Sequence, residues 1–201
     1  QNMGLNYNLR ADYKIQTSDE NFFKKAMFNN ARSGIQHDFA SSTNLKLFKY
    51  FTLSPSASLK KVWYFDQIEK HYDENRAEVV TDTLSGFKSF NEYNTSLSLS
   101  TVLYGTFNFK KGRLQAIRHT LTPNISFNYK PDFSYYYKDF QASADPTDIK
   151  EYNPFQNGIY GGPSSGLSES IGFSVNSVLE AKVMPKDSTE AKAKKITILN
   201  N

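Results

Sequence analysis

Apolar and polar residues alternate along most of the chain. In the stretch NEYNTSLSLSTVLYGTFNFKK, residues 91–111, the odd positions are mainly aromatic, aliphatic or Thr, and the even positions are mainly Ser, Thr and Asn. Because successive side chains of a β-strand point to opposite faces, this period of two predicts a strand with one apolar and one polar face.

The same alternation recurs and predicts an all-β fold. Strands are expected at about 3–16, 33–48, 51–65, 91–110, 117–130, 168–184 and 195–201. The connections between them alternate in length, with long loops expected at 17–32, 66–90 and 131–167, short turns at 49–50 and 111–116, and an intermediate connection at 185–194. This alternation is typical of an antiparallel up-and-down meander of about seven long strands.

Strand length and the position of aromatic residues favour a membrane barrel over a soluble sandwich. Several expected strands exceed the roughly 5–6 residues usual in sandwiches and reach the about 9–11 residues that a membrane strand needs. Bulky aromatics on the apolar parity gather near strand ends, for example Tyr93 and Phe107, as in the aromatic girdles of barrels. We therefore expect residues 1–201 to be a partial transmembrane β-barrel.

The alternation assigns side chains to the two surfaces of such a barrel wall. The residues expected to face lipid are Leu97, Leu99, Leu103, Phe107, Phe109, Ile125, Phe127, Phe173 and Val175. The residues expected to face the lumen are Asn6, Asn8, Arg10, Ser96, Ser98, Asn124, Ser126, Asn128 and Asn176. Two polar residues, His37 and Lys61, interrupt the apolar parity, and a bulge near Lys61 is one explanation.

Composition changes this interpretation little. The mean hydropathy of −0.60 is typical of soluble proteins, but a barrel hides its apolar band in every second residue. The net charge of +4 comes from scattered residues, so no nucleic-acid partner is expected. The sequence has no cysteine and no apolar run long enough for a spanning helix. Both ends fall within alternating segments, which suggests a fragment of a longer chain.

Few residues suggest chemistry. The three histidines, His37, His71 and His119, lack ligand spacing, so we predict no metal, cofactor or catalytic residue. A serine beside His119 on an outer face would suggest a lipid hydrolase, whose ester cleavage His119→Ala would abolish. The run DFSYYYKDF, residues 132–140, suggests either a sugar- or peptide-binding loop or a loop folded into a barrel.

One segment resembles a known family. The stretch AIRHTLTPNISFNYKPDFSYYY, residues 116–137, is similar to a characteristic segment of the LptD family of outer-membrane lipopolysaccharide assembly proteins. Residues 160–183 resemble the glycine-rich loop and next strand of that family, and residues 47–59 resemble an earlier turn and strand. The positions that carry the central similarity are Arg118, His119, Thr120, Leu121, Pro123, Tyr129 and Pro131.

The resemblance implies a function and partners. It implies a wall segment of a very large barrel in the outer membrane of a Gram-negative bacterium, which exports lipopolysaccharide and inserts it into the outer leaflet without bond chemistry. It also implies a lipoprotein plug of the LptE type, a periplasmic transport bridge and contact with membrane lipids. The alternatives are another large barrel of the TonB-dependent receptor type, or a secreted β-sandwich that binds a ligand.

Overall fold

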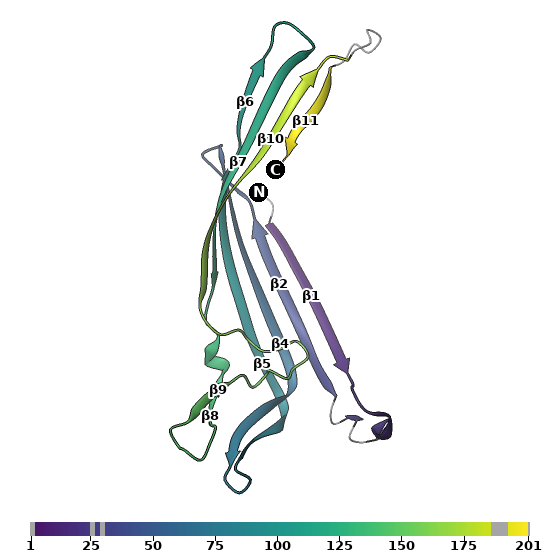
Figure 1. Cartoon of the computed structure of the whole chain (residues 1–201), viewed down its shortest axis with the longest axis vertical. Helices are drawn as coiled ribbons and strands as arrows, with labels where there is room; N and C mark the ends of the chain where they lie inside the picture. Colours follow the sequence, from purple (N-terminus) through teal and green to yellow (C-terminus); the bar gives the residue numbers. More distant parts are fainter. Residues whose placement is uncertain (1–2, 25–26, 29–30, 186–192, 201) are drawn as a thin grey trace.

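The computed structural model describes residues 3–24, 27–28, 31–185 and 193–200, which form an almost entirely β structure (Figure 1). The strands are β1 (Met3–Lys14), β2 (Arg32–Thr43), β3 (Leu45–Leu47), β4 (Phe51–Asp73), β5 (Glu78–Thr101), β6 (Leu103–Asn108), β7 (Leu114–Lys130), β8 (Lys138–Gln141), β9 (Ile149–Tyr152), β10 (Ser168–Val183) and β11 (Lys194–Asn200). Two short 3-10 turns are η1 (Asp19–Asn21) and η2 (Ser134–Tyr136). In the described part of the chain, no helix has the length and apolar character needed to cross a membrane.

The main sheet is an antiparallel meander. Its order is β1-β2-β4-β5-β7-β10-β11, with β3 also pairing with β4 and β6 with β7. Since β3 extends β2 and β6 extends β5, these elements form seven long ribbons, each beside its neighbours in sequence. The predicted all-β meander is thus confirmed. The sheet is a single curved layer that does not close on itself (Figure 1), and the described residues form no sandwich.

The pairing register places odd-numbered and even-numbered residues on opposite faces across most of the sheet. Tyr7 lies opposite Phe39, Leu97 opposite Phe127, and Phe127 opposite Ile171. Directly opposed residues of antiparallel strands point to the same face. From β1 to β10, odd-numbered residues therefore share one face and even-numbered residues share the other. In β4 this holds up to the bulge after Tyr64. We call these the odd face and the even face.

The prediction of a long loop at 66–90 is wrong. Strand β4 continues to Asp73 and β5 begins at Glu78, so a long hairpin occupies this segment. The prediction failed because this hairpin extends past the end of β7, which pairs with β5 only from Thr95 onward. Charged residues occur on both parities there, so no apolar alternation marks the strands. The turn chemistry is visible in Ala77, whose φ is +54°.

The other connections lie at the two ends of the sheet. The described residues between β1 and β2 and the segment 131–167 are at the same end as the β4–β5 hairpin, and the shorter turns at 48–50 and 109–113 are at the opposite end (Figure 1). The long connection 131–167 contains η2 and the small β8–β9 sheet. Most of the expected connection at 185–194 lies outside the described residues.

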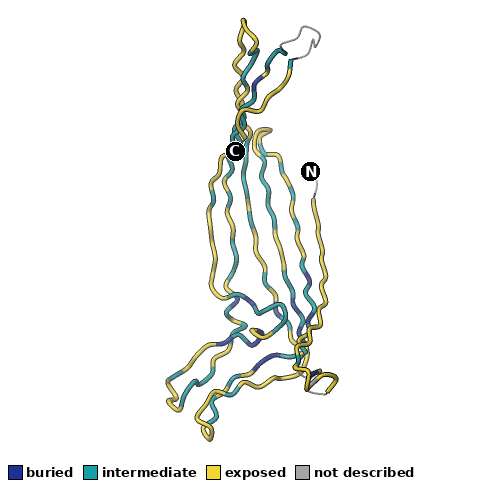
Figure 2. Tube along the Cα trace, turned by 45° about the vertical axis from the view of Figure 1, so that its right-hand side comes forward, coloured by how far each residue is buried: buried dark blue, intermediate teal, exposed yellow. Residues whose placement is uncertain are grey.

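Buried residues concentrate at the end with the long connections (Figure 2). A core cluster forms there from Val62, Tyr64, Phe90 and Phe155. Elsewhere large apolar side chains of the odd face are exposed, with 74% of Leu5 and 73% of Phe173 accessible. An apolar surface of this extent indicates contact with a membrane or another protein.

Candidate functional site: the polar face of the sheet and its covering loop

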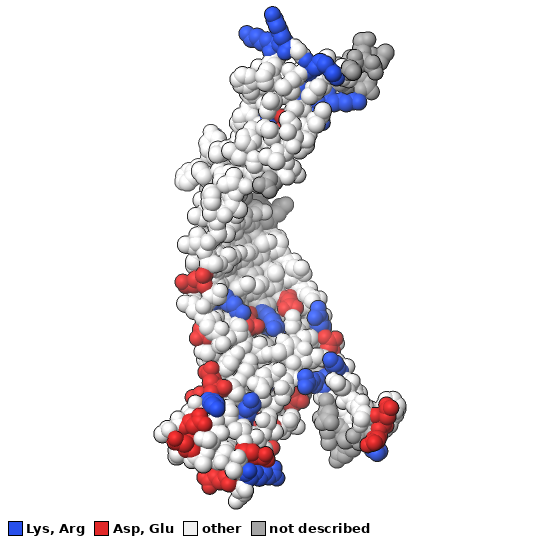
Figure 3. All heavy atoms as spheres, viewed as in Figure 1, with Lys and Arg blue, Asp and Glu red and all other residues white. Residues whose placement is uncertain are grey.

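A belt without Lys, Arg, Asp or Glu crosses the sheet between its two ends. In β7 it covers residues 119–129, eleven positions, and in β10 it covers residues 170–179, ten positions. The charged side chains gather at the two ends of the visible face, with an almost uncharged band between them (Figure 3). The length of this belt matches the about 9–11 residues with which a tilted strand crosses a bilayer.

The structure separates the two sets of residues predicted from the alternation. Leu97, Ile125 and Phe173 belong to the odd face with the rest of the predicted lipid-facing set, and Phe109, one residue beyond β6, packs its ring 5.0 Å from that of Phe107. Ser98 and Ser126 belong to the even face with the rest of the predicted lumen-facing set. The even face carries small hydroxyl and amide groups within the belt, for instance the Ser56 and Ser96 hydroxyls, 2.6 Å apart.

The 131–167 loop folds back over one end of the even face. The Tyr64 hydroxyl accepts a hydrogen bond from the Tyr160 backbone N–H at 2.9 Å and donates one to the Gly161 carbonyl at 2.8 Å. The Tyr160 hydroxyl donates to the Arg10 carbonyl in β1 at 3.1 Å. A Cβ at Gly158 would overlap the Tyr64 ring, so this close approach requires glycine. The loop that connects β7 with β10 thus reaches across the sheet to β1.

A carboxylate at the edge of the belt anchors the loop. Glu92 accepts hydrogen bonds from both the backbone N–H and the hydroxyl of Ser164, each at 2.8 Å. The ammonium groups of Lys60 and Lys130 each lie 3.5 Å from the same carboxylate. The side chain of Glu92 is only 12% exposed, so these partners offset the cost of burying its charge.

Aromatic packing completes the attachment of the loop. The Phe155 ring stacks on Tyr64 with centroids 5.8 Å apart, and it lies 5.2 Å from Phe90. Tyr136, from the aromatic run DFSYYYKDF, contacts both Phe90 and Phe155. Phe133 of the same run is buried against Tyr93. Of the two interpretations of this run, the packing favours a folded-in loop, because most of its rings are engaged within the protein.

The base of the loop is tied by a second carboxylate. Asp132 accepts hydrogen bonds from the Ser134 N–H and hydroxyl at 2.8 and 2.9 Å, and from the Gly166 N–H at 2.8 Å. These hydrogen bonds favour the ionised form and hold the pKa of Asp132 below its usual value. Both ends of the 131–167 loop are therefore joined through one side chain.

The histidines lie in three separate environments. His37 is buried in an aromatic group of the odd face, where its Nδ1 is 2.8 Å from the Tyr7 hydroxyl and its ring is 4.3 Å from that of Trp63. His71 is in the β4–β5 hairpin, 3.6 Å from Asp82. His119 lies on the odd face, with its Nε2 2.9 Å from the Ser177 hydroxyl. Among the described residues, no three His, Asp or Glu side chains group as metal ligands.

Sequence reasoning missed the residues that hold the loop. Glu92 and Ser164 are 72 positions apart, and no local pattern connects them. A usable signal did exist, because Val62, Tyr64 and Phe90 place apolar groups on the otherwise polar even parity. Such a break in the alternation indicates that another segment covers that part of the face.

Comparison with known proteins gives one result. The family model described as LptD protein matches residues 1–201, the whole chain. No curated protein and no solved structure matches the chain.

Proposed function

The chain belongs to the LptD protein family, whose members transport lipopolysaccharide through an outer-membrane barrel, and from this premise we propose that its sheet forms part of the wall of such a barrel. In this role the odd face contacts the hydrocarbon of the outer membrane, and the even face lines a wide aqueous lumen. The wall guides the passage of lipopolysaccharide and carries out no bond chemistry.

The observation that carries the proposal is the separation of two chemically different faces within an uncharged belt. The odd face presents Leu97, Leu99 and Phe173 to its surroundings, and the even face presents Ser96 and Ser98. Exposed apolar groups are favourable against lipid, whereas backbone and hydroxyl groups on a lumen wall remain hydrated. A single-layered sheet satisfies both requirements only when water lies on one side and hydrocarbon on the other.

The arrangement of the connections supports an orientation. Outer-membrane barrels have short turns on the periplasmic side and long loops outside. We therefore assign 17–32, the β4–β5 hairpin and 131–167 to the cell exterior, and 49–50, 111–116 and 185–194 to the periplasm. In this orientation the 131–167 loop covers part of the lumen wall at its outer end.

Partners and location follow from the family. We assign the chain to the outer membrane of a Gram-negative bacterium, with lipopolysaccharide as cargo and membrane lipids around the odd face. A lipoprotein plug of the LptE type and a periplasmic transport bridge complete the assembly. The family match favours this role over that of a TonB-dependent receptor.

Matched substitutions at adjacent residues of the full-length protein test the wall assignment. A basic residue on the lipid face at the bilayer midplane costs roughly 2–4 kcal/mol, whereas a lumen position tolerates it. Leu99→Arg should therefore reduce assembly into the outer membrane, and Ser98→Arg should assemble almost normally. Heat-modifiable electrophoretic mobility of the two variants measures this difference. Equal assembly of both variants would contradict the assignment of the faces.

A further inference from the structure

An open apolar groove crosses the odd face from β1 to β5. A row of small residues runs along it, since Ser41 lies opposite Ala57 and Ala57 lies opposite Thr95. The next row toward the long connections is bulky and contains Tyr7, Phe39, Leu59 and Tyr93, each opposite the next. The groove between these rows has a volume of about 610 Å³. A second hollow shares the small row and continues the groove to Leu97 and Phe127.

The following row on the same face carries a cation. Lys61 lies there, opposite His37 in β2 and Asn91 in β5. It is the only Lys or Arg of the odd face among the described strand residues. Its ammonium is 5.9 Å from the centre of the Trp63 ring, and it forms no ion pair with any described residue. A charge placed on the apolar face without a partner of opposite sign is therefore free to meet an anion.

Carboxylates do not compete for this position. Glu169, the only acidic residue of the odd face in the described strands, is in β10, three strands and therefore about 14 Å away. Asp38 and Glu92 are closer in the register but belong to the even face, where Glu92 is paired with Lys60 and Lys130. An anionic ligand on the odd face thus meets the lysine without a neighbouring carboxylate on that face.

Two ring nitrogens beside Lys61 add to the positive potential. His37 Nε2 and Trp63 Nε1 are buried and have no hydrogen-bond partner within the described part of the chain, and the two rings are 4.3 Å apart. The Trp63 nitrogen is always a donor, and His37 Nε2 is also a donor when the Tyr7 hydroxyl donates to Nδ1, 2.8 Å away. Because both atoms are covered by neighbouring side chains, they favour an anion through their N–H dipoles and not by direct contact.

The order of the three rows matches an amphipathic molecule. Along β4 the odd face passes from the small Ala57, through the bulky Leu59, to the cation of Lys61. Four residues of a strand span about 13 Å, so the cation lies about that far from the small row. Acyl chains fit the first two rows, and a phosphate fits the third. A free anion would use only the lysine, and a lipid without net charge would use only the groove.

We infer that this surface is a binding site for one anionic, phosphate-bearing lipid of the surrounding membrane. Its acyl chains lie in the groove over Ala57, the rings of Phe39 and Tyr93 border them, and its phosphate pairs with the Lys61 ammonium. The inference rests on the proposed function, because the odd face must contact the bilayer. It deepens that function by assigning one class of lipid to one place on the barrel wall.

Native mass spectrometry of the full-length protein in detergent tests the site. The probes are phosphatidylglycerol and lipid A as anionic lipids, phosphatidylcholine as a lipid without net charge, and inorganic phosphate as a headgroup without chains. At least one anionic lipid should be retained about fivefold more than phosphatidylcholine, the factor expected for one lysine near a membrane surface. Inorganic phosphate should not displace it. Equal retention of all three lipids, or complete displacement by inorganic phosphate, would overturn the inference.

Two pairs of variants locate the binding. Lys61→Gln should lower retention of the anionic lipid to that of phosphatidylcholine, whereas Lys88→Gln, on the even face opposite Tyr64, should leave it unchanged. Ala57→Phe fills the groove with an apolar ring and should also weaken retention. Its control is Val175→Phe, on the odd face in β10 and outside the groove. Unaltered retention in Lys61→Gln would contradict the site.

Failure of the lipid site and failure of the wall assignment are distinguishable. If Leu99→Arg assembles as well as Ser98→Arg, the odd face does not border hydrocarbon, and both proposals are contradicted. If the wall test gives the expected difference while Lys61→Gln retains as much anionic lipid as Lys88→Gln, only the lipid site is contradicted.

Discussion

At the scale of single residues, Glu92 decides how firmly the 131–167 loop is held on the even face. Its carboxylate is shared by two lysines and by Ser164. Glu92→Gln keeps the shape of the side chain but removes its charge, which should weaken attachment of the loop by about 1 kcal/mol. A change of this size opens the loop roughly fivefold more often. Cleavage by trypsin at Lys138 and Lys150, both in this loop, measures the opening.

Glu169 provides the matched control for this substitution. It carries the same charge but lies on the odd face opposite Tyr129, and it forms no ion pair with any described residue. Glu169→Gln should leave the rate of cleavage unchanged. If Glu92→Gln is cleaved no faster than Glu169→Gln, the ion pairs do not hold the loop.

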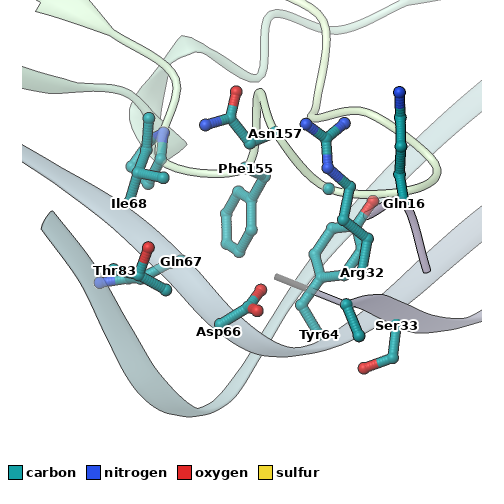
Figure 4. A pocket seen from close by; sticks show the side chains of 13 residues that line it. Gln16, Arg32, Ser33, Tyr64, Asp66, Gln67, Ile68, Thr83, Phe155 and Asn157 are labelled. Carbon is teal, nitrogen blue, oxygen red and sulfur yellow. The ribbon is translucent and has the colours of Figure 1, made fainter. Parts of the chain in front are cut away.

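The sequence predicts side-chain direction well and side-chain partners poorly. The parity of Leu99 and Ser98 follows from the strand period alone, because every second residue points the same way. The contact between Tyr64 and Gly158 depends on the path of a long loop, which no local pattern describes. The cavity lined by Gln16, Gln67 and Asn157 is hidden for the same reason, since these residues meet only after that loop has folded back (Figure 4).

At the scale of elements, the β4–β5 hairpin is where expectation and structure differ most. Its strands pair as far as Asp73 and Glu78 although their side chains are mostly polar. Backbone hydrogen bonds and contact with the loop hold it, including the bond from the Ile68 N–H to the Pro154 carbonyl at 2.9 Å. The apolar period detects strands with one apolar face, but it does not detect paired strands whose side chains are polar on both faces.

Hydrogen exchange tests whether this hairpin is formed in solution. Paired amides exchange only when the structure opens, so their rates report local stability. Peptides covering 67–73 and 78–84 should exchange more slowly than the turn at 74–77 in the full-length protein. Uniformly fast exchange across 66–90 would contradict the hairpin and support the loop that the sequence alone predicted.

At the scale of the whole molecule, the meander places the long connections at one end and the short turns at the other (Figure 1). The proposed orientation assigns the first end to the cell exterior. An epitope inserted at Asp145, in the β8–β9 turn, should be labelled on intact cells. An epitope at Gly112, in the turn between β6 and β7, should be labelled only after the outer membrane is opened. The opposite pattern would reverse the orientation.

The most direct test of the wall assignment measures which side chains contact the hydrocarbon of a bilayer. A fluorescent label placed in turn at positions 96, 97, 98, 99 and 100 of the full-length protein, reconstituted with doxyl-labelled lipids, reports contact with hydrocarbon at each residue. Quenching should alternate with a period of two, strong at Leu97 and Leu99 and weak at Ser96, Ser98 and Ser100, because the proposed wall assigns only the odd residues to lipid. Equal quenching along the stretch, or stronger quenching at the serines, would contradict the assignment of the odd face to the membrane.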